Sequence, residues 1–142
     1  MKKLGILGCG WLGTKLASKL NSHKWNVKVS KTSTEGVVEL RKRGIDSYLV
    51  DLSENSIKGD LEFFDNLDKL LISIPPKRDS IGNFSKKINF LLNYLKSKSN
   101  IKIIYLLIFF LYCSYFSNTA IYSPYRRRRT KAMAILAGLF SA

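Results

Sequence analysis

The feature that most constrains how this chain can fold is a glycine pattern near its amino terminus. Residues 8–13 read GCGWLG, which spaces three glycines as G-x-G-x-x-G. An apolar run over residues 2–8 predicts a short buried strand before the pattern. Beyond it, one apolar stripe at intervals of four predicts a helix: Leu12, Leu16 and Leu20. The glycines are therefore expected to form the turn from a strand into a helix.

The same alternation of strand and helix continues over the first hundred residues. Short apolar strands are expected at residues 27–29, 48–50, 70–74 and 101–107. One helix is expected between Thr32, which with Glu35 has the spacing of a capping box, and Gly44, which suits a left-handed end. Another is expected over residues 84–95. This order is typical of an α/β fold with a doubly wound parallel sheet, here truncated after its fifth strand.

In that context each glycine has a physical reason. Gly8 allows the tight turn, Gly10 lets phosphates approach the main chain, and Gly13 lets the helix pack close to the strand. Phosphates there would meet main-chain N–H groups and the positive end of the helix dipole. A Rossmann-like, dinucleotide-binding fold is predicted; the alternative is a tight turn without a ligand. The loop expected to bind the pyrophosphate consists of Gly8, Cys9, Gly10, Trp11, Leu12 and Gly13.

The residues after the second strand indicate which dinucleotide is bound. An NAD site usually offers a carboxylate to the ribose about twenty residues beyond the glycines, but this chain reads Ser30-Lys31-Thr32 there. A lysine between two hydroxyl groups suits a 2′-phosphate, so NADP is expected to be preferred over NAD. The alternative is an ordinary solvated lysine.

Three further residues are expected around the dinucleotide. Asp51, at the end of the third strand, could accept a hydrogen bond from the adenine amino group, and a solvated turn aspartate is the equal alternative. Ile74 and Pro75, at the carboxyl end of the next strand, are expected to line the wall beside the nicotinamide ribose. The sequence has no Cys/His cluster with metal-ligand spacing, so no metal site is predicted.

Composition divides the chain in two. The 24 basic and 10 acidic residues give a net charge of +14, yet every acid lies at or before Asp79 and residues 80–142 contain none. From about residue 105 the sequence becomes an aromatic, apolar run followed by four consecutive arginines. Soluble domains normally mix both charges on their surface. We therefore expect a domain over residues 1–105 and an aberrant tail over residues 106–142, either read out of frame or disordered.

Targeting and membrane signals are weak in this sequence. The apolar run Ile103–Phe116, which carries no charge, has 14 residues, fewer than the ~20 needed to cross a bilayer. The apolar stretch before Cys9 is shorter than the core of a signal peptide. Cys9 and Cys113 form no spacing motif, which suits thiols in a reducing compartment. A cytoplasmic protein without membrane association is predicted.

These residues resemble those of a known family. The segments GILGCGWLGTKLA, VKVSKTST and LLISIPPKR are similar to the Rossmann domains of the NAD(P)-dependent epimerase/dehydratase group, the extended short-chain dehydrogenase-like proteins, over about residues 1–105. Leu7 stands where the commonest spacing of that group has a glycine. The resemblance implies a cofactor-dependent epimerase or reductase acting on a small molecule. It also implies a Tyr-x-x-x-Lys pair after the fifth strand, and the sequence beyond residue 107 has none, so no catalytic residue is assigned.

A second interpretation belongs to a different functional class. Arg126–Arg129 could form a basic-aromatic module that stacks on single-stranded nucleic acid or lies on an anionic membrane surface. An arginine run in a tail is more often solvated charge, so dinucleotide binding remains the first prediction. The aromatic residues of this module would be Tyr112, Tyr115, Phe116, Tyr122 and Tyr125.

Overall fold

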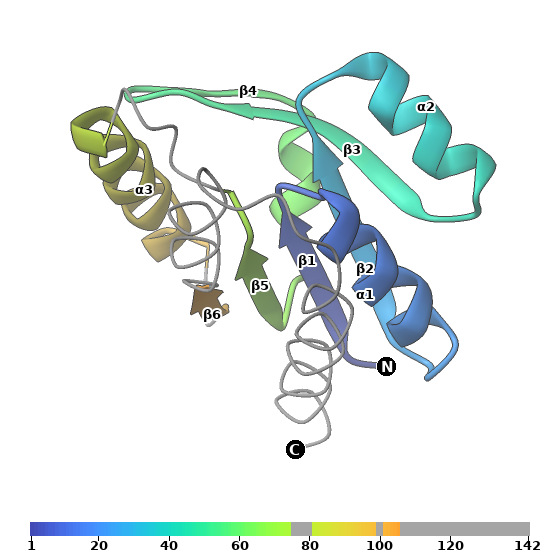
Figure 1. Ribbon diagram of the computed structural model, residues 1–142. Helices are drawn as coiled ribbons and strands as arrows, with labels where there is room; N and C mark the ends of the chain where they lie inside the picture. Colours follow the sequence, from blue (N-terminus) through green and yellow to red (C-terminus); the bar gives the residue numbers. More distant parts are fainter. Residues whose placement is uncertain (75–80, 99–100, 106–142) are drawn as a thin grey trace, which may run out of the picture. The chain divides into compact units, whose positions relative to one another are not determined.

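The computed structural model describes residues 1–74, 81–98 and 101–105, all within one compact unit, Met1–Leu107 (Figure 1). The expectations for Pro75 and for the tail at residues 106–142 lie outside the described residues. Within the described part, no helix is both long enough and apolar enough to span a bilayer.

Six strands form one sheet in the order β4-β3-β2-β1-β5-β6. Five of them run parallel, and β4 is antiparallel to its neighbour β3. From β1 the chain builds the sheet outward through β2 and β3, and then crosses to the other side of β1 for β5 and β6 (Figure 1). The predicted α/β fold with a doubly wound parallel sheet is confirmed. The strands are β1 (Lys3–Leu7), β2 (Asn26–Lys31), β3 (Asp46–Leu52), β4 (Ile57–Gly59), β5 (Lys69–Ile72) and β6 (Lys102–Tyr105).

Helices pack on both faces of the sheet because successive side chains of β1 point in opposite directions. Ile6 faces α1 (Trp11–Asn21), and α2 (Thr34–Lys42) contacts β2 and β3. Leu7 faces the other way, toward the short 3-10 helix η1 (Leu61–Phe64) and α3 (Ile81–Lys96). The apolar cluster on that face is formed mainly by Leu7, Leu52, Phe63, Phe64, Leu70, Ile72, Leu91 and Leu95.

The antiparallel strand β4 was not predicted from the sequence. Its three residues carry no hydrophobic alternation, and main-chain geometry fixes their place. Gly59 has φ +100°. The next residue, Asp60, forms hydrogen bonds with both the main-chain oxygen and the main-chain N–H of Leu49 in β3. The Asp60 N–H donates to the Leu49 oxygen at 2.7 Å, and the Leu49 N–H donates to Asp60 Oδ2 at 2.9 Å. The hydrogen bond to the Asp60 side chain thus fixes the short edge strand β4 against β3.

The predicted start of α2 was wrong by one residue. Thr32 lies exposed in the bend before the helix, and Ser33 is the residue that caps it. The Ser33 Oγ accepts the Gly36 N–H at 3.3 Å. Three hydroxyl residues in a row offer equivalent caps by type, so the sequence pattern could not select among them. The left-handed end at Gly44 is confirmed, with φ +72°.

An exposed ion pair gives a testable dependence of stability on pH. Lys98 Nζ donates to Asp65 Oδ1 at 2.6 Å and joins the segment after α3 to the turn after η1. This bond lowers the pKa of Asp65 below its ordinary 3.8 and raises the pKa of Lys98 above its ordinary 10.5.

The contribution of Asp65 to stability is complete above its unfolded pKa and is lost as the pH falls through the lowered value. The contribution of Lys98 is lost as the pH rises through its raised value. Asp65→Asn is therefore expected to flatten both limbs of a stability curve measured by urea unfolding from acid to alkaline pH. Unchanged limbs would contradict this assignment.

Candidate functional site

The glycine loop lies between β1 and α1, at the carboxyl ends of the parallel strands (Figure 1). Gly8 has φ +86°, a conformation that side chains disfavour. A Cβ there would lie 2.8 Å from Ile74 Cγ1 and 3.2 Å from the Ile74 main-chain nitrogen. Gly8 therefore permits both the turn and the close approach of the chain that leaves β5. Ile74, expected at the site, does lie against the loop.

Gly13 is a contact point between α1 and β1. A Cβ at this position would lie 3.2 Å from both Ile6 Cγ2 and Cys9 Sγ, closer than ordinary van der Waals contact. The helix approaches the strand through this missing side chain. The geometry agrees with the packing role expected for the third glycine.

Gly10 differs from the other two because no contact within residues 1–74, 81–98 and 101–105 requires it to be a glycine. It is the N-cap of α1 with φ −80°, and a Cβ built on it meets no atom within 4 Å. Among the described residues, no side chain caps this helix, and its first turn holds no acid. The Leu12 and Gly13 amides have no protein acceptor there. Open space in front of main-chain N–H groups at the start of a helix is a geometry that binds anions.

The three other loop residues take different positions. Cys9 is buried, its Sγ lies 3.5 Å from Thr14 Oγ1, and burial raises the pKa of the thiol. Leu12 is also buried, in the apolar layer under α1. Trp11 begins the helix and is 39% exposed. Cys9 and Leu12 can therefore reach a ligand only through their main chains.

The residues that end β2 divide between the interior and the surface. Ser30 is 1% exposed, and its hydroxyl faces the glycine loop. Lys31 is half-buried, and its methylene stem lies over the first turn of α2, because a Cβ at Gly36 would approach Lys31 Cδ to 3.2 Å. Thr32 is exposed in the bend that follows. Lys31 and Thr32 are thus available beside the start of a second helix.

Asp51 lies near the carboxyl end of β3, away from the glycine loop. It is exposed on β3, directly opposite Lys58 of β4, and β2 separates its strand from the glycine loop. An opposite charge across two antiparallel strands is a structural reason for this aspartate. Its expected role toward adenine remains a prediction.

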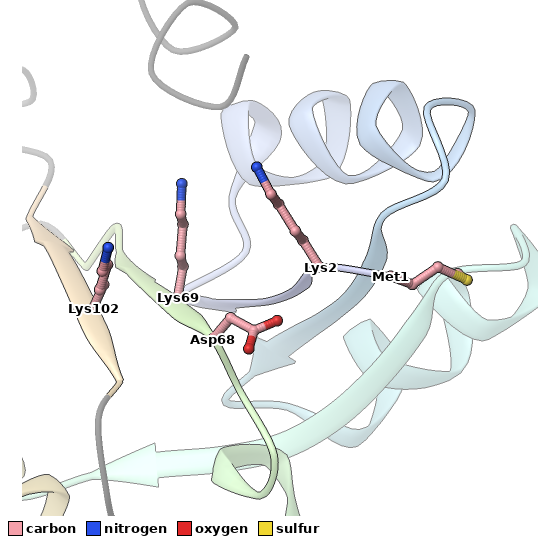
Figure 2. A pocket seen from close by; sticks show the side chains of 5 residues that line it. All are labelled: Met1, Lys2, Asp68, Lys69 and Lys102. Atoms are coloured by element: carbon pink, nitrogen blue, oxygen red, sulfur yellow. The ribbon is translucent and has the colours of Figure 1, made fainter. Parts of the chain in front are cut away.

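An open hollow of about 440 Å³ lies at the opposite edge of the sheet, where the strands begin (Figure 2). Lys2, Lys69 and Lys102 extend side by side from this edge (Figure 2). The Lys3 N–H donates to Asp68 Oδ2 at 2.7 Å, so that carboxylate helps hold the edge together. Ligands of open α/β sheets bind beyond the carboxyl ends of the strands, so this hollow is not the candidate dinucleotide site.

Similarities to known proteins agree with this architecture. Several solved structures align with the chain at low sequence identity, among them two reductases and a TrkA-N domain. Yeast methylglyoxal/isovaleraldehyde reductase Gre2, complexed with NADPH, has a TM-score of 0.55 at 13% identity, over 71% of this chain and 36% of Gre2. Vestitone reductase from alfalfa has a TM-score of 0.52 at 14% identity, over 74% of this chain and 36% of the reductase. The TrkA-N domain of the Escherichia coli inner membrane protein ybaL has a TM-score of 0.54 at 19% identity, over 95% of this chain and 96% of that domain.

The chain has a Rossmann fold. No family model matches it. In sequence it is 40% identical to protein YeeZ of Escherichia coli strain K12 over 85 residues, which are 58% of this chain and 31% of YeeZ. The match therefore spans about a third of that relative. In this Rossmann fold, the glycine loop occupies the edge where the strand order turns back on itself.

The structure brings most of the predicted site residues to the carboxyl edge of the parallel strands. It also shows a contact that the sequence did not indicate, between the Ser30 hydroxyl and the Gly8 N–H of the glycine loop. Ser30 was expected to donate to a phosphate, but its side chain is turned inward to the loop. The only sequence signal for this contact is a small polar residue at the end of a buried strand, and that pattern is too common to be specific.

Proposed function

We propose that this chain binds a nicotinamide dinucleotide, with the pyrophosphate at the amino end of α1. The observation that carries the proposal is the open space before Gly10, next to the Leu12 and Gly13 amides, which have no acceptor within the described part of the chain. A dinucleotide would bring its phosphates to that point without meeting a side chain. The Rossmann fold and the NADPH in the Gre2 complex support this class of ligand.

A thermal-shift experiment on the full chain tests the proposal. A ligand that binds only the folded state at a concentration of one hundred times its Kd stabilises the protein by about 2.7 kcal/mol. For a domain of this size, the melting temperature should rise by about 10 °C. No rise with either NADP or NAD would exclude the function.

We propose further that NADP is preferred, because Lys31 and Thr32 lie where an NAD site usually has a carboxylate. Lys31→Gln is expected to weaken NADP binding about tenfold, since a charge-assisted hydrogen bond to the 2′-phosphate is lost. The affinity for NAD should change less than about twofold, because NAD lacks that group. Calorimetric titration with both dinucleotides measures the ratio.

Lys15→Gln is the matched control, since Lys15 is an exposed lysine on α1 and its loss removes the same charge. An equal loss of NADP affinity in both variants would point to general electrostatics. Tighter binding of NAD by the original chain would refute the preference itself.

The chemistry supplied by a bound nicotinamide is hydride transfer, and we propose an oxidoreductase role of the epimerase or reductase type in the cytoplasm. The sequence after β6 has no Tyr-x-x-x-Lys pair that could exchange a proton with a substrate. Tyr94 and Lys98 have that spacing, but they lie at the end of α3, where Lys98 pairs with Asp65. We therefore expect the chain to bind the dinucleotide without turnover. Loss of NADPH absorbance with small carbonyl substrates would contradict this.

The boundary near residue 105 belongs to the same proposal. Residues 1–105 would be the dinucleotide-binding domain, and the segment from residue 106 would be read out of frame, since it holds no acidic residue. Sequencing the gene decides the point. A second frame that restores a mixed-charge sequence supports it, and its absence overturns it.

A further inference from the structure

Ser30 lies where the hydrogen bonding between β1 and β2 gives way to the glycine loop. The paired residues of these two strands end with Ile6 and Val29. Ser30 is one residue beyond Val29, and Gly8 is two residues beyond Ile6. The Gly8 N–H donates to Ser30 Oγ at 3.1 Å, and the Cys9 N–H donates to the Ser30 carbonyl at 2.9 Å. One residue of β2 therefore holds two consecutive amides of the loop.

These two bonds determine which amides face a ligand. The Gly10 N–H donates to the Gly8 oxygen at 2.9 Å, and the Thr14 N–H donates to the Gly10 oxygen at 3.0 Å. The amides of Gly8, Cys9, Gly10 and Thr14 are thus all used within the protein. The Leu12 and Gly13 amides have no acceptor among the residues that the structure describes, and they can meet an anion. Their direction depends on how the preceding turn is held.

The Gly8 N–H bonds a side chain because the pairing of β1 with β2 has ended at Ile6 and Val29, and Gly8 turns the chain away from the sheet at φ +86°. Ser30 is only 1% exposed, so bulk water does not reach the Gly8 N–H to take the place of the serine hydroxyl as its acceptor. A side chain that cannot accept would leave the Gly8 N–H without its acceptor, and the turn would relax toward solvent.

We propose that Ser30 is a positioning residue: it fixes the Gly8–Cys9 turn, and through it the first-turn amides of α1, without touching the dinucleotide. This inference rests on the proposed function. It differs from the expected role of Ser30 as a partner of the 2′-phosphate. A direct partner would act on NADP alone, whereas a positioning residue acts on the pyrophosphate, which NADP and NAD share.

Ser30→Ala in the full chain is the test, and Ser47→Ala is the matched control. Ser47 is fully buried on the neighbouring strand β3, where its hydroxyl donates to the Val37 oxygen at 3.0 Å on the α2 side. Both variants lose one buried hydroxyl bond. Ser30→Ala is expected to weaken NADP and NAD equally, by about tenfold, while Ser47→Ala leaves both affinities within about twofold.

Amide hydrogen exchange of the ligand-free chain provides a second measurement. The Gly8 and Cys9 amides should be protected in the original chain and exchange at least about tenfold faster in Ser30→Ala. In Ser47→Ala their protection should stay. If Ser30→Ala does not fold, protection of the Gly8 amide in the original chain still decides, because a fast-exchanging Gly8 amide overturns the proposal.

Each result separates the inference from the function on which it rests. If the original chain binds neither dinucleotide, the proposed function fails. The amide exchange rates of Gly8 and Cys9 then test by themselves whether Ser30 fixes the turn. If Ser30→Ala loses affinity for NADP only, the serine contacts the 2′-phosphate and the positioning role is wrong. Unchanged affinities in Ser30→Ala also overturn it.

Discussion

Replacing Gly10 with alanine is expected to weaken dinucleotide binding about one hundredfold, which corresponds to about 2.7 kcal/mol, with little change in folding. The added methyl group would occupy the open space where the pyrophosphate is proposed to approach the main chain. Titration of NADP by calorimetry, beside urea unfolding of the ligand-free variant, measures both effects.

The folding side of this prediction follows from the conformation of Gly10. Its φ of −80° and ψ of −161° suit any residue, and a Cβ meets no protein atom within 4 Å. Alanine is a poorer N-cap than glycine, but it also restricts the unfolded chain, so the two effects nearly cancel. The free energy of unfolding should change by less than about 1 kcal/mol.

Gly44→Ala is the reciprocal control. Gly44 also has nothing within 4 Å of a Cβ, but its φ is +72° and it lies beyond the end of α2. Here the expected result is reversed: a loss of about 1 kcal/mol in stability and unchanged affinity. If Gly10→Ala binds NADP as tightly as the original chain, the pyrophosphate does not lie at this turn.

Replacing Gly59 with alanine is expected to produce the largest loss of stability, about 3 kcal/mol or more. The residue has φ +100°, and a Cβ would lie 2.1 Å from the Leu49 oxygen. That contact is with main chain, so a rotamer change cannot relieve it. The same Leu49 oxygen accepts the Asp60 N–H, and this bond would be strained as well.

The loss should appear as a lower urea midpoint, because domains of this size have only about 5–15 kcal/mol of stability. Gly44→Ala again serves as the comparison, since it has the positive φ without the main-chain contact. A midpoint for Gly59→Ala equal to that of Gly44→Ala would show that β4 can move away from β3 at little cost.

The parts of this fold that could be predicted from sequence are those with a strong repeating signal. The apolar runs of β1 and β5, and the stripe on α1, are set by burial and need no knowledge of their partners. The glycine loop was also predictable, because its spacing reflects three separate steric demands. Two of these, at Gly8 and Gly13, arise within the protein itself.

The features that escaped prediction depend on contacts between distant residues. The strand β4 is held by Asp60, whose carboxylate accepts from Leu49, 11 positions away. The inward hydroxyl of Ser30 meets an amide 22 positions away. The choice of Ser33 over Thr32 as a helix cap turns on main-chain angles near the bend. None of these pairings leaves a periodic trace in the sequence.

The reversal of strand order around β1 has a consequence for how recognition and reaction are arranged along the chain. A dinucleotide lying across this point would place its adenosine half over β2 and β3, and its reactive ring over β5 and β6. The first sixty residues would then select the coenzyme, while everything from β5 onward would select the reactant. Exchange of the later half between related genes could change the chemistry and keep the coenzyme.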